Sequence, residues 1–264
     1  MSARPIPEQH APFVQVEQSG GVTRLTLNRA AQYNSLSEGM LDALQAELAA
    51  VAGDAQCRVV VLAAAGKAFC AGHDLREMRS KPQLDYYRNL FARCSKVMLA
   101  IQTLPQPVIA RVQGIATAAG CQLVATCDLA VASDEARFAV SGVNLGLFCS
   151  TPAVPLSRNV SRKQAFEMLV TGDFIDARQA LERGLVNRVA AADALDAEVQ
   201  KLAASILAKP AAAIAAGKGL FYRQLEMGIE AAYQLAGQTM ACNMMDDSAQ
   251  EGFLAFLEKR PPRQ

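Results

Sequence analysis

The stretch that decides the fold follows an apolar, β-branched run over residues 59–64 and reads Ala68-Phe69-Cys70-Ala71-Gly72-His73-Asp74-Leu75. A continuous apolar run is typical of a strand that is buried on both faces. Small residues bracket a single aromatic in residues 68–75, and small residues allow two backbone segments to approach closely. The sequence therefore predicts a buried strand followed by a tight turn region rather than by a helix.

A second stretch repeats this pattern farther along the chain. Residues 107–112 form another apolar run, Gly114 follows, and residues 118–123 read Ala-Ala-Gly-Cys-Gln-Leu. Here the turn opens a helix, and the free N–H groups and dipole at a helix start favour negative charge. One interpretation is that both turns only pack a strand closely against a helix. The alternative is that two N–H groups point at one substrate oxygen, as in an oxyanion hole.

Strands alternate with helices on either side of these stretches. Residues 13–17 and 22–27 predict a hairpin joined at Ser19-Gly20-Gly21. Ser37 is placed to cap a helix that runs to about Val51. Residues 84–104 predict a long amphipathic helix, and further buried strands are predicted at 108–112 and 129–132. This alternation predicts an α/β fold with parallel strands.

From Ala191 to the end the pattern is almost wholly helical. The predicted helices cover residues 191–208, 210–225, 228–244 and 246–258 and are separated by Pro210, Gly228 and the Asp246-Asp247 pair. We therefore predict a boundary near residue 200. Residues 1–200 would form the core, and residues 201–264 would form a C-terminal helical region that packs on a partner subunit.

Composition excludes several classes of protein. Lys plus Arg is 26 and Asp plus Glu is 25, so a net charge of +1 disfavours a nucleic-acid partner. Seven scattered cysteines without a C-x-x-C pair favour a reducing compartment. With His10 and His73 the only histidines, no metal site is predicted. No apolar stretch is long enough for a membrane span, and the N-terminus lacks a signal sequence, so we expect a cytoplasmic protein.

Two common nucleotide-binding patterns are also missing from the turns. No Lys-Ser/Thr pair follows Gly114–Gly120, so this turn is not a P-loop. No G-x-G-x-x-G follows a strand either, and that is the fingerprint of dinucleotide-binding folds. The motifs that are present form an ordered set: Leu27-Asn28-Arg29, Asn34-Ser35-Leu36, Ala68–Leu75, Pro107–Ala110, Gly114, Gly120–Leu123, Cys127-Asp128, Phe138, Thr171-Gly172, Ala177, Ala180, Gly184–Val186 and Phe253–Pro261. This set resembles a known family, the crotonase (enoyl-CoA hydratase/isomerase) superfamily.

This resemblance covers nearly the whole chain from about residue 13 and implies a fold, a partner and an assembly. The implied fold is a crotonase-like spiral of β-β-α turns with a C-terminal helical trimerisation region. The implied partner is an acyl-CoA thioester, so coenzyme A enters as part of the substrate and no cofactor is bound permanently. The implied assembly is a homotrimer or a dimer of trimers. The stretch Gly146–Pro152 resembles one subgroup, the enoyl-CoA hydratase domain-containing protein 3 group.

The resemblance also assigns residues. The oxyanion-hole N–H groups fall on His73 and Ala119, where Ala119 stands in place of the usual Gly. Because only its N–H is needed, the hole survives if φ stays negative at Ala119. The strand and turn around Ala71 are placed against the acyl-CoA, and Arg29 and Lys67 are placed to meet its phosphates or adenine. As an alternative, both charges are ordinary surface residues.

The two catalytic glutamates of the family's hydratases are missing. Gln122 stands at one position and Gly142 at the other. An amide does not accept a proton at neutral pH, and each general acid–base group contributes roughly 10²–10⁴ in rate. We therefore expect low hydratase activity. The combined substitution Gln122→Glu and Gly142→Glu should raise hydration more than either change alone.

Other groups could carry the chemistry. His73 is the plausible near-neutral titrating side chain, with either a catalytic or an orienting role. Cys149 stands where the dihydroxynaphthoyl-CoA synthases carry a catalytic Asp, and it either lines the pocket or acts as a thiolate. Ser141, Asn144 and Ser150 could hold a water, and Asp74 is predicted to cap the next turn. Three functions stay open: an enolate-forming enzyme of lyase, isomerase or hydrolase type, a CoA-binding protein with little turnover, and a structural oligomer.

Overall fold

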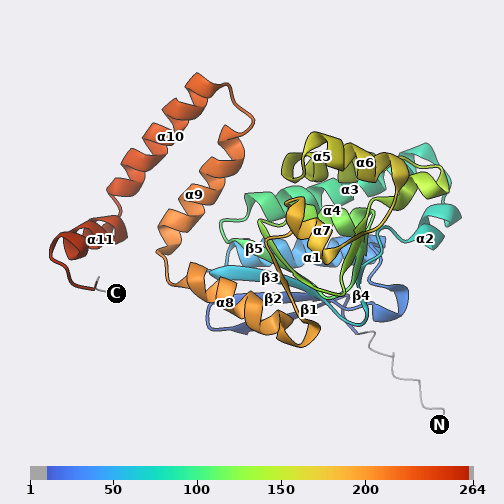
Figure 1. Ribbon diagram of the computed structural model, residues 1–264, viewed down its shortest axis with the longest axis horizontal. Helices are drawn as coiled ribbons and strands as arrows, with labels where there is room; N and C mark the ends of the chain where they lie inside the picture. The colour runs from blue at the N-terminus through green and yellow to red at the C-terminus, as the bar shows by residue number, and fades with distance from the viewer. Residues whose placement is uncertain (1–10, 262–264) are drawn as a thin grey trace, which may run out of the picture.

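A computed structural model describes residues 11–261 of the chain. Figure 1 shows a main body of strands and helices from which three C-terminal helices project to one side. The N-terminal ten residues, for which the absence of a signal sequence was predicted, lie outside the described residues. Among the described residues, no helix is both long and apolar enough to cross a bilayer.

Two sheets form the centre of the main body. The larger has the strand order β1-β2-β3-β5-β7-β10, and its pairings are parallel except for the hairpin between β1 and β2. The smaller has the order β4-β6-β8-β9. The strands are β1 Val14–Ser19, β2 Val22–Leu27, β3 Val59–Ala64, β4 Ala68–Cys70, β5 Val108–Val112, β6 Ile115–Thr117, β7 Leu129–Ser133, β8 Arg137–Ala139, β9 Ile175–Asp176 and β10 Arg188–Ala190.

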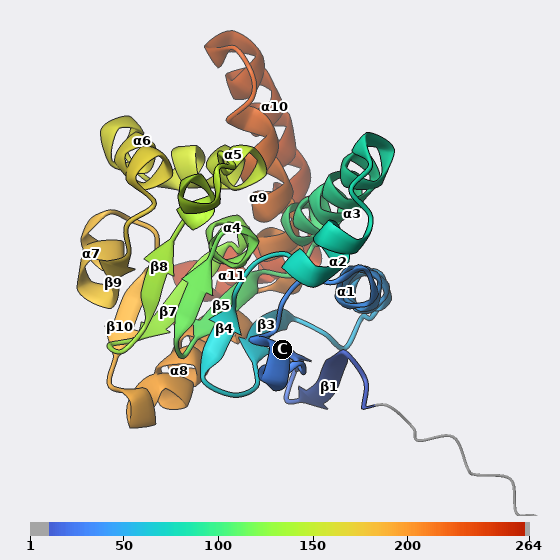
Figure 2. The same ribbon diagram turned by 90° about the vertical axis from the view of Figure 1, so that its right-hand side faces the viewer.

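The chain winds through the two sheets in repeated β-β-α turns. Strands β3, β5 and β7 lie side by side in the larger sheet, and each is followed at once by β4, β6 or β8 in the smaller sheet. Helices then return the chain to the next turn (Figure 2). The predicted α/β class, the parallel strands and the β-β-α spiral are therefore confirmed.

Helices cover the sheets. They are α1 Glu38–Ala52, α2 Leu75–Ser80, α3 Leu84–Thr103, α4 Ala119–Thr126, α5 Ser150–Asn159, α6 Arg162–Thr171, α7 Ala177–Glu182 and α8 Leu195–Leu207, with short 3-10 helices at Ala30–Gln32, Ser141–Leu145 and Ala192–Ala194. Helices α1, α3 and α4 lie where the sequence predicts helices, whereas α2, α5, α6 and α7 were not predicted. The Ser37 side chain accepts the N–H of Met40 and caps α1, as predicted. The segment after β4 is a turn only as far as Asp74, because α2 then begins.

The larger sheet is buried on both faces, as its apolar strands predict. In β3, Val60 and Leu62 join the main core, whereas Val59 and Val61 face the other way and pack with residues of α8. This alternation follows from the two-residue period of a strand. Helix α8 is fixed there by Asp196, whose carboxylate accepts hydrogen bonds from Arg111 at 2.7 and 2.8 Å and from Arg24 at 2.9 Å.

Asp196 gives a testable pH dependence. Arg111, and then Arg24, lower the pKa of this carboxyl from 3.8 to about 2. A carboxyl with a lowered pKa stabilises the fold above its unfolded pKa and loses that effect as the pH falls through the folded value. Because the side chain is half exposed and water screens the pair, we expect about 1 kcal/mol. Calorimetric melting should show Asp196→Asn less stable than the wild type at pH 6, with a difference that shrinks from pH 5 to pH 3.

The projecting helices are α9 Ala211–Gln224, α10 Ile229–Met244 and α11 Asp247–Leu257. They carry many of the exposed large apolar side chains, including Ile229 at 74%, Tyr233 at 73% and Phe256 at 81% exposed. The predicted boundary after residue 200 falls inside α8, which packs on the sheet, so the projecting part begins only at Ala211. The division of the chain into two domains stays a prediction.

A buried polar cluster attaches α9 to the main body. Lys218 is the only buried residue of this helix. Its ammonium donates to the carbonyls of Ile101 and Gln106, both at 2.9 Å, and to the carboxylate of Asp128 at 2.6 Å. Tyr222, one turn later, donates to the same carboxylate at 2.8 Å. A network of charge-assisted hydrogen bonds therefore joins α9 to the main body.

Candidate active site

Two turns meet at the point where β4 and β6 end. Gly72 has φ +90°, which a residue with a side chain rarely adopts. A Cβ added to Gly72 would lie 3.0 Å from the Cβ of Ala118 and 3.2 Å from the backbone nitrogen of Ala119. The turn after β4 thus lies directly against the start of α4, and a larger residue at position 72 would push the two apart.

This arrangement leaves two backbone N–H groups without acceptors. Leu36 donates to the carbonyl of Gly72 at 2.8 Å and accepts from the N–H of Asp74. His73 lies between them, so its own N–H points away from Leu36. Ala119 is the first residue of α4, where N–H groups have no partner within the helix. Within residues 11–261, no acceptor is found for either group.

The turn into α4 is strained. Ala118 has φ 51° and ψ −121°, a conformation that costs of order 1–3 kcal/mol for a residue with a side chain. It is held there because its N–H donates to Ala139 and its carbonyl accepts from Gln122. Ala119 itself is not among the residues with positive φ. Ala119 therefore keeps the negative φ that an N–H donor at this position requires. The strained backbone is at Ala118, one residue earlier.

A cavity of about 200 Å³ opens beside these N–H groups. Leu75, Met78 and Phe91, from α2 and α3, form one wall, and residues 141–152 form most of the other. The lining includes Ala71, His73, Ala119, Gly142 and Cys149, so the structure brings these predicted residues together. The wall from α2 and α3 was not predicted, because only tertiary packing brings these two helices over the turn.

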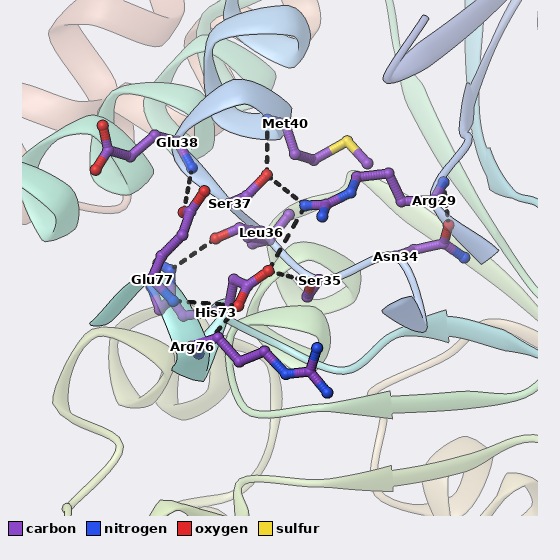
Figure 3. A network of polar contacts seen from close by, with 11 residues as sticks. Arg29, Asn34, Ser35, Leu36, Ser37, Glu38, Met40, His73, Arg76 and Glu77 are labelled. Carbon is purple, nitrogen blue, oxygen red and sulfur yellow. Dashed lines mark hydrogen bonds and ion pairs between the residues drawn. The ribbon is translucent and has the colours of Figure 1, made fainter. Parts of the chain in front are cut away.

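His73 lines the cavity, and its ring is held by two contacts. Its Nδ1 lies 3.4 Å from the carbonyl oxygen of Leu36 (Figure 3). A carbonyl only accepts, so this contact requires the hydrogen on Nδ1. The ring packs edge-on against Phe91, and its Nε2 is buried without a partner among the described residues. Burial lowers the pKa of His73, so the imidazole is neutral at pH 7.

Gln122 lies in the first turn of α4 but does not line the cavity among the described residues. It is 4% exposed, and its amide oxygen has no hydrogen-bond partner there. A buried amide oxygen without a partner costs free energy, so a hydrogen-bond donor that reaches this oxygen would be bound favourably. The structure shows no protonatable group at this position.

Gly142 leaves no space for a second glutamate. A Cβ at this position would lie 2.3 Å from the carbonyl oxygen of Leu147 and 2.7 Å from the thiol sulfur of Cys149. The N–H of Gly142 also donates to this sulfur at 3.2 Å. The obstacle to a side chain is therefore contact with the 147–149 segment rather than the backbone conformation of Gly142.

This packing corrects the expected effect of adding both glutamates. A side chain at Gly142 must displace the 147–149 segment, and such overpacking typically costs 1–3 kcal/mol. We expect the Gln122→Glu, Gly142→Glu double variant to hydrate crotonyl-CoA no faster than Gln122→Glu alone. Loss of crotonyl-CoA, followed by absorbance, compares the two proteins. A double variant that hydrates crotonyl-CoA clearly faster than both single variants would contradict this expectation. It would show that the 147–149 segment moves aside without loss of activity.

The two residues predicted to contact CoA, Arg29 and Lys67, lie outside the cavity lining, after β2 and between β3 and β4. Arg29 donates to Ser37 at 2.7 Å (Figure 3) and lies 3.7 Å from the carboxylate of Asp74. Its guanidinium also lies over the ring of Phe13. Its charge is thus engaged, although part of the side chain stays exposed. Lys67 is exposed between β3 and β4. Their contact with CoA phosphates or adenine stays a prediction.

Asp74 and Ser141 have defined partners. Asp74 accepts the N–H groups of Arg76 and Glu77 and so caps α2, as predicted. Ser141 lines the cavity, and its hydroxyl lies 2.9 Å from that of Thr117 at the end of β6. No sequence pattern pointed to the Thr117–Ser141 pair, because the two residues come from different β-β-α turns.

Comparison with known proteins identifies the family. The family model described as enoyl-CoA hydratase/isomerase matches residues 17–264. The chain belongs to the enoyl-CoA hydratase/isomerase family. A Xenopus laevis relative, named enoyl-CoA hydratase domain-containing protein 3, mitochondrial, is 45% identical over 96% of this chain and 86% of its own length.

Solved structures agree with this membership. A Mycobacterium smegmatis structure described as an enoyl-CoA hydratase is 64% identical, has a TM-score of 0.95 and covers 96% of this chain and 99% of its own. The human enoyl-CoA hydratase domain-containing protein 3 structure is 43% identical, with a TM-score of 0.92 and coverage of 96% and 100%. The predicted resemblance to this family and to its domain-containing protein 3 subgroup is confirmed.

The comparisons contradict one prediction. We expected a cytoplasmic protein, but relatives from Xenopus laevis, Rattus norvegicus and Homo sapiens are named as mitochondrial. The expectation rested on the absence of a targeting segment and on reduced cysteines. Reduced cysteines indicate a reducing environment, but they do not identify one compartment. The cytoplasmic assignment is therefore withdrawn.

Proposed function

We propose that this protein binds an acyl-CoA thioester and polarises its carbonyl through the N–H groups of His73 and Ala119. The observation that carries the proposal is the contact between the Gly72 turn and the start of α4, beside a cavity. Two fixed donors at one oxygen stabilise the negative charge of an enolate as it develops. The strain at Ala118 is consistent with a turn kept for function rather than for stability.

The reaction best supported is one that passes through a thioester enolate, of lyase, isomerase or hydrolase type. Ordinary hydration needs groups that activate water, and no Asp or Glu lines the cavity among the described residues. Gln122 and Gly142, at the two glutamate positions, supply none. We therefore propose that hydratase activity is low.

Coenzyme A enters this proposal as part of the substrate. Ala71 and His73 line the cavity where the thioester would lie. Arg29 and Lys67 lie outside the cavity lining, where the phosphates or adenine could be met. Because the ion pair of Arg29 with Asp74 is already formed, Lys67 has the freer charge for a phosphate.

The alternative function is a CoA-binding protein with little turnover. It is favoured by the same missing carboxylates, and it differs from the enzyme only in the chemical step. Crotonyl-CoA, butyryl-CoA and free CoA should each raise the melting temperature under both functions, since a ligand bound only by the native state stabilises it. No shift with any of them would overturn both and leave a structural oligomer. A turnover screen across acyl-CoA thioesters then separates enzyme from binder.

We also propose assembly as a homotrimer or a dimer of trimers through the projecting helices. The support is the exposed apolar side chains of α10 and α11, among them Ile229, Tyr233, Phe256 and Leu257. Exposed apolar patches of this kind mark protein interfaces. Light scattering at micromolar concentration should give a mass of three or six chains, and a monomer mass would contradict the proposal.

A further inference from the structure

The thiol of Cys149 occupies the place of a side chain that Gly142 lacks. Its sulfur lies 2.7 Å from the Cβ that any other residue at position 142 would carry. A catalytic side chain on Gly142 would therefore have to pass through the site where this sulfur now lies. The cavity lining thus includes a titratable thiol directly beside Gly142, supplied by the neighbouring segment.

The surroundings of the thiol favour a transient anion. Cys149 is the N-cap residue of α5, a helix of ten residues, and its sulfur accepts the N–H of Gly142 at 3.2 Å. Helix starts and N–H donors stabilise a thiolate. Burial acts in the opposite direction and raises the pKa of Cys149 overall, so the resting group is the neutral thiol.

Few other titratable groups face this thiol. The Cys121 thiol lies on the α4 side, and burial raises its pKa to about 12, so it stays protonated. His73 lies in the same lining, with its Nε2 buried and unpartnered. From α5 and from Ser141–Leu145, the hydroxyl-bearing residues in the lining are Ser141, Ser150 and Thr151. No charged side chain of the described residues is in the lining, so the choice of proton carrier is between Cys149 and His73.

We propose that the Cys149 thiol carries the proton to and from the α-carbon of the bound thioester. This inference rests on the proposed function and names the group that performs its proton transfer. It also names the substrate class: thioesters with a hydrogen on the α-carbon and an apolar acyl group that fits against Leu75, Met78 and Phe91.

The step balances without a further reactant. The Cys149 thiol first releases its proton to solvent. The thiolate then takes the α-hydrogen as a proton, so an S–H bond forms and the α-C–H bond breaks. The electron pair of that bond moves into the thioester, giving an enolate whose oxygen is held by the two N–H groups. Return of the proton to the α-carbon restores the substrate. Delivery to the γ-carbon of a 3-enoyl thioester would shift the double bond, and no water is consumed.

Exchange of the α-hydrogens of butyryl-CoA in D₂O tests this assignment, with mass spectrometry of the recovered thioester as the readout. For the wild type we expect the rate to rise about tenfold per pH unit from pH 6 to pH 9, as the thiolate fraction does. Cys149→Ala should lower the rate by roughly 10²–10⁴. Cys149→Ser should lose as much, since a hydroxyl is a far weaker acid. Cys149→Asp should restore exchange with a flat profile above about pH 6.

Controls separate this inference from the proposed function. Cys242→Ala removes an exposed thiol outside the cavity and should leave exchange unchanged. The infrared band of the bound thioester carbonyl should be the same in Cys149→Ala as in the wild type, because the N–H donors remain. A rate that is flat above pH 7, or unchanged in Cys149→Ala, would assign the proton to His73 and overturn the inference. A shifted carbonyl band without any exchange would overturn both the inference and the proposed enolate reaction, and would leave only the binding of an acyl-CoA thioester and the polarisation of its carbonyl. An unshifted band would overturn the proposed function itself.

Discussion

An Ala119→Pro protein is expected to fold and to lose most of its α-hydrogen exchange with butyryl-CoA. Proline is well tolerated at the first position of a helix, where the N–H has no partner and φ is already near the proline value. The substitution removes one of the two proposed donors, and its ring occupies the space in front of the nitrogen. Loss of one such donor costs about 2.7–4 kcal/mol of transition-state stabilisation, or 10²–10³ in rate.

The control for this variant is Ala211→Pro. Ala211 is also the first residue of its helix, α9, and it is exposed and away from the cavity. The Ala211→Pro protein should exchange the α-hydrogens of butyryl-CoA at the wild-type rate. If Ala119→Pro has a melting temperature near that of the wild type and also exchanges at the wild-type rate, Ala119 is not an oxyanion donor.

Lys218→Met is expected to be the most destabilising single change considered. Methionine has a similar length, but it leaves the largely buried Asp128 carboxylate with two donors among residues 11–261, the N–H of Val108 and the hydroxyl of Tyr222. Removal of one partner of a buried ion pair typically costs 3–5 kcal/mol. It also leaves the carbonyls of Ile101 and Gln106 without their donor. The melting temperature should fall by many degrees.

Two comparisons make this result specific. Lys201→Met, at an exposed lysine in α8, should change stability by no more than about 0.5 kcal/mol. Adding Asp128→Asn to Lys218→Met removes the uncompensated charge and should recover part of the loss. An unchanged melting temperature for Lys218→Met would mean that the cluster does not hold α9 to the main body.

The fold could be predicted largely because its signals are local. The β1–β2 hairpin follows from Ser19-Gly20-Gly21, and the start of α1 follows from Ser37. The buried run of β3 follows from residues that are apolar on both faces. Each of these signals lies within a few residues of the structure it predicts. The placement of Lys218 against Asp128 joins residues 90 positions apart, and no local pattern encodes it.

The site could be predicted only in part for the same reason. The family motifs located the turns at His73 and Ala119, which the structure places side by side. Two features depend on tertiary contacts and were missed: the strained φ of Ala118 and the sulfur of Cys149 in the space beside Gly142. The structure argues against the expected gain from a glutamate at Gly142, because the carbonyl of Leu147 closes that space and the sequence does not show this contact.

The most direct test of the account is the infrared stretching band of butyryl-CoA labelled with ¹³C at the thioester carbonyl. Hydrogen bonds from the N–H groups of His73 and Ala119 should draw electron density toward the oxygen and weaken the C=O bond. We predict that binding to the wild type lowers the frequency of the band below its value in water, and that binding to Ala119→Pro reverses most of this shift. A bound thioester with the same frequency as in water would contradict the account.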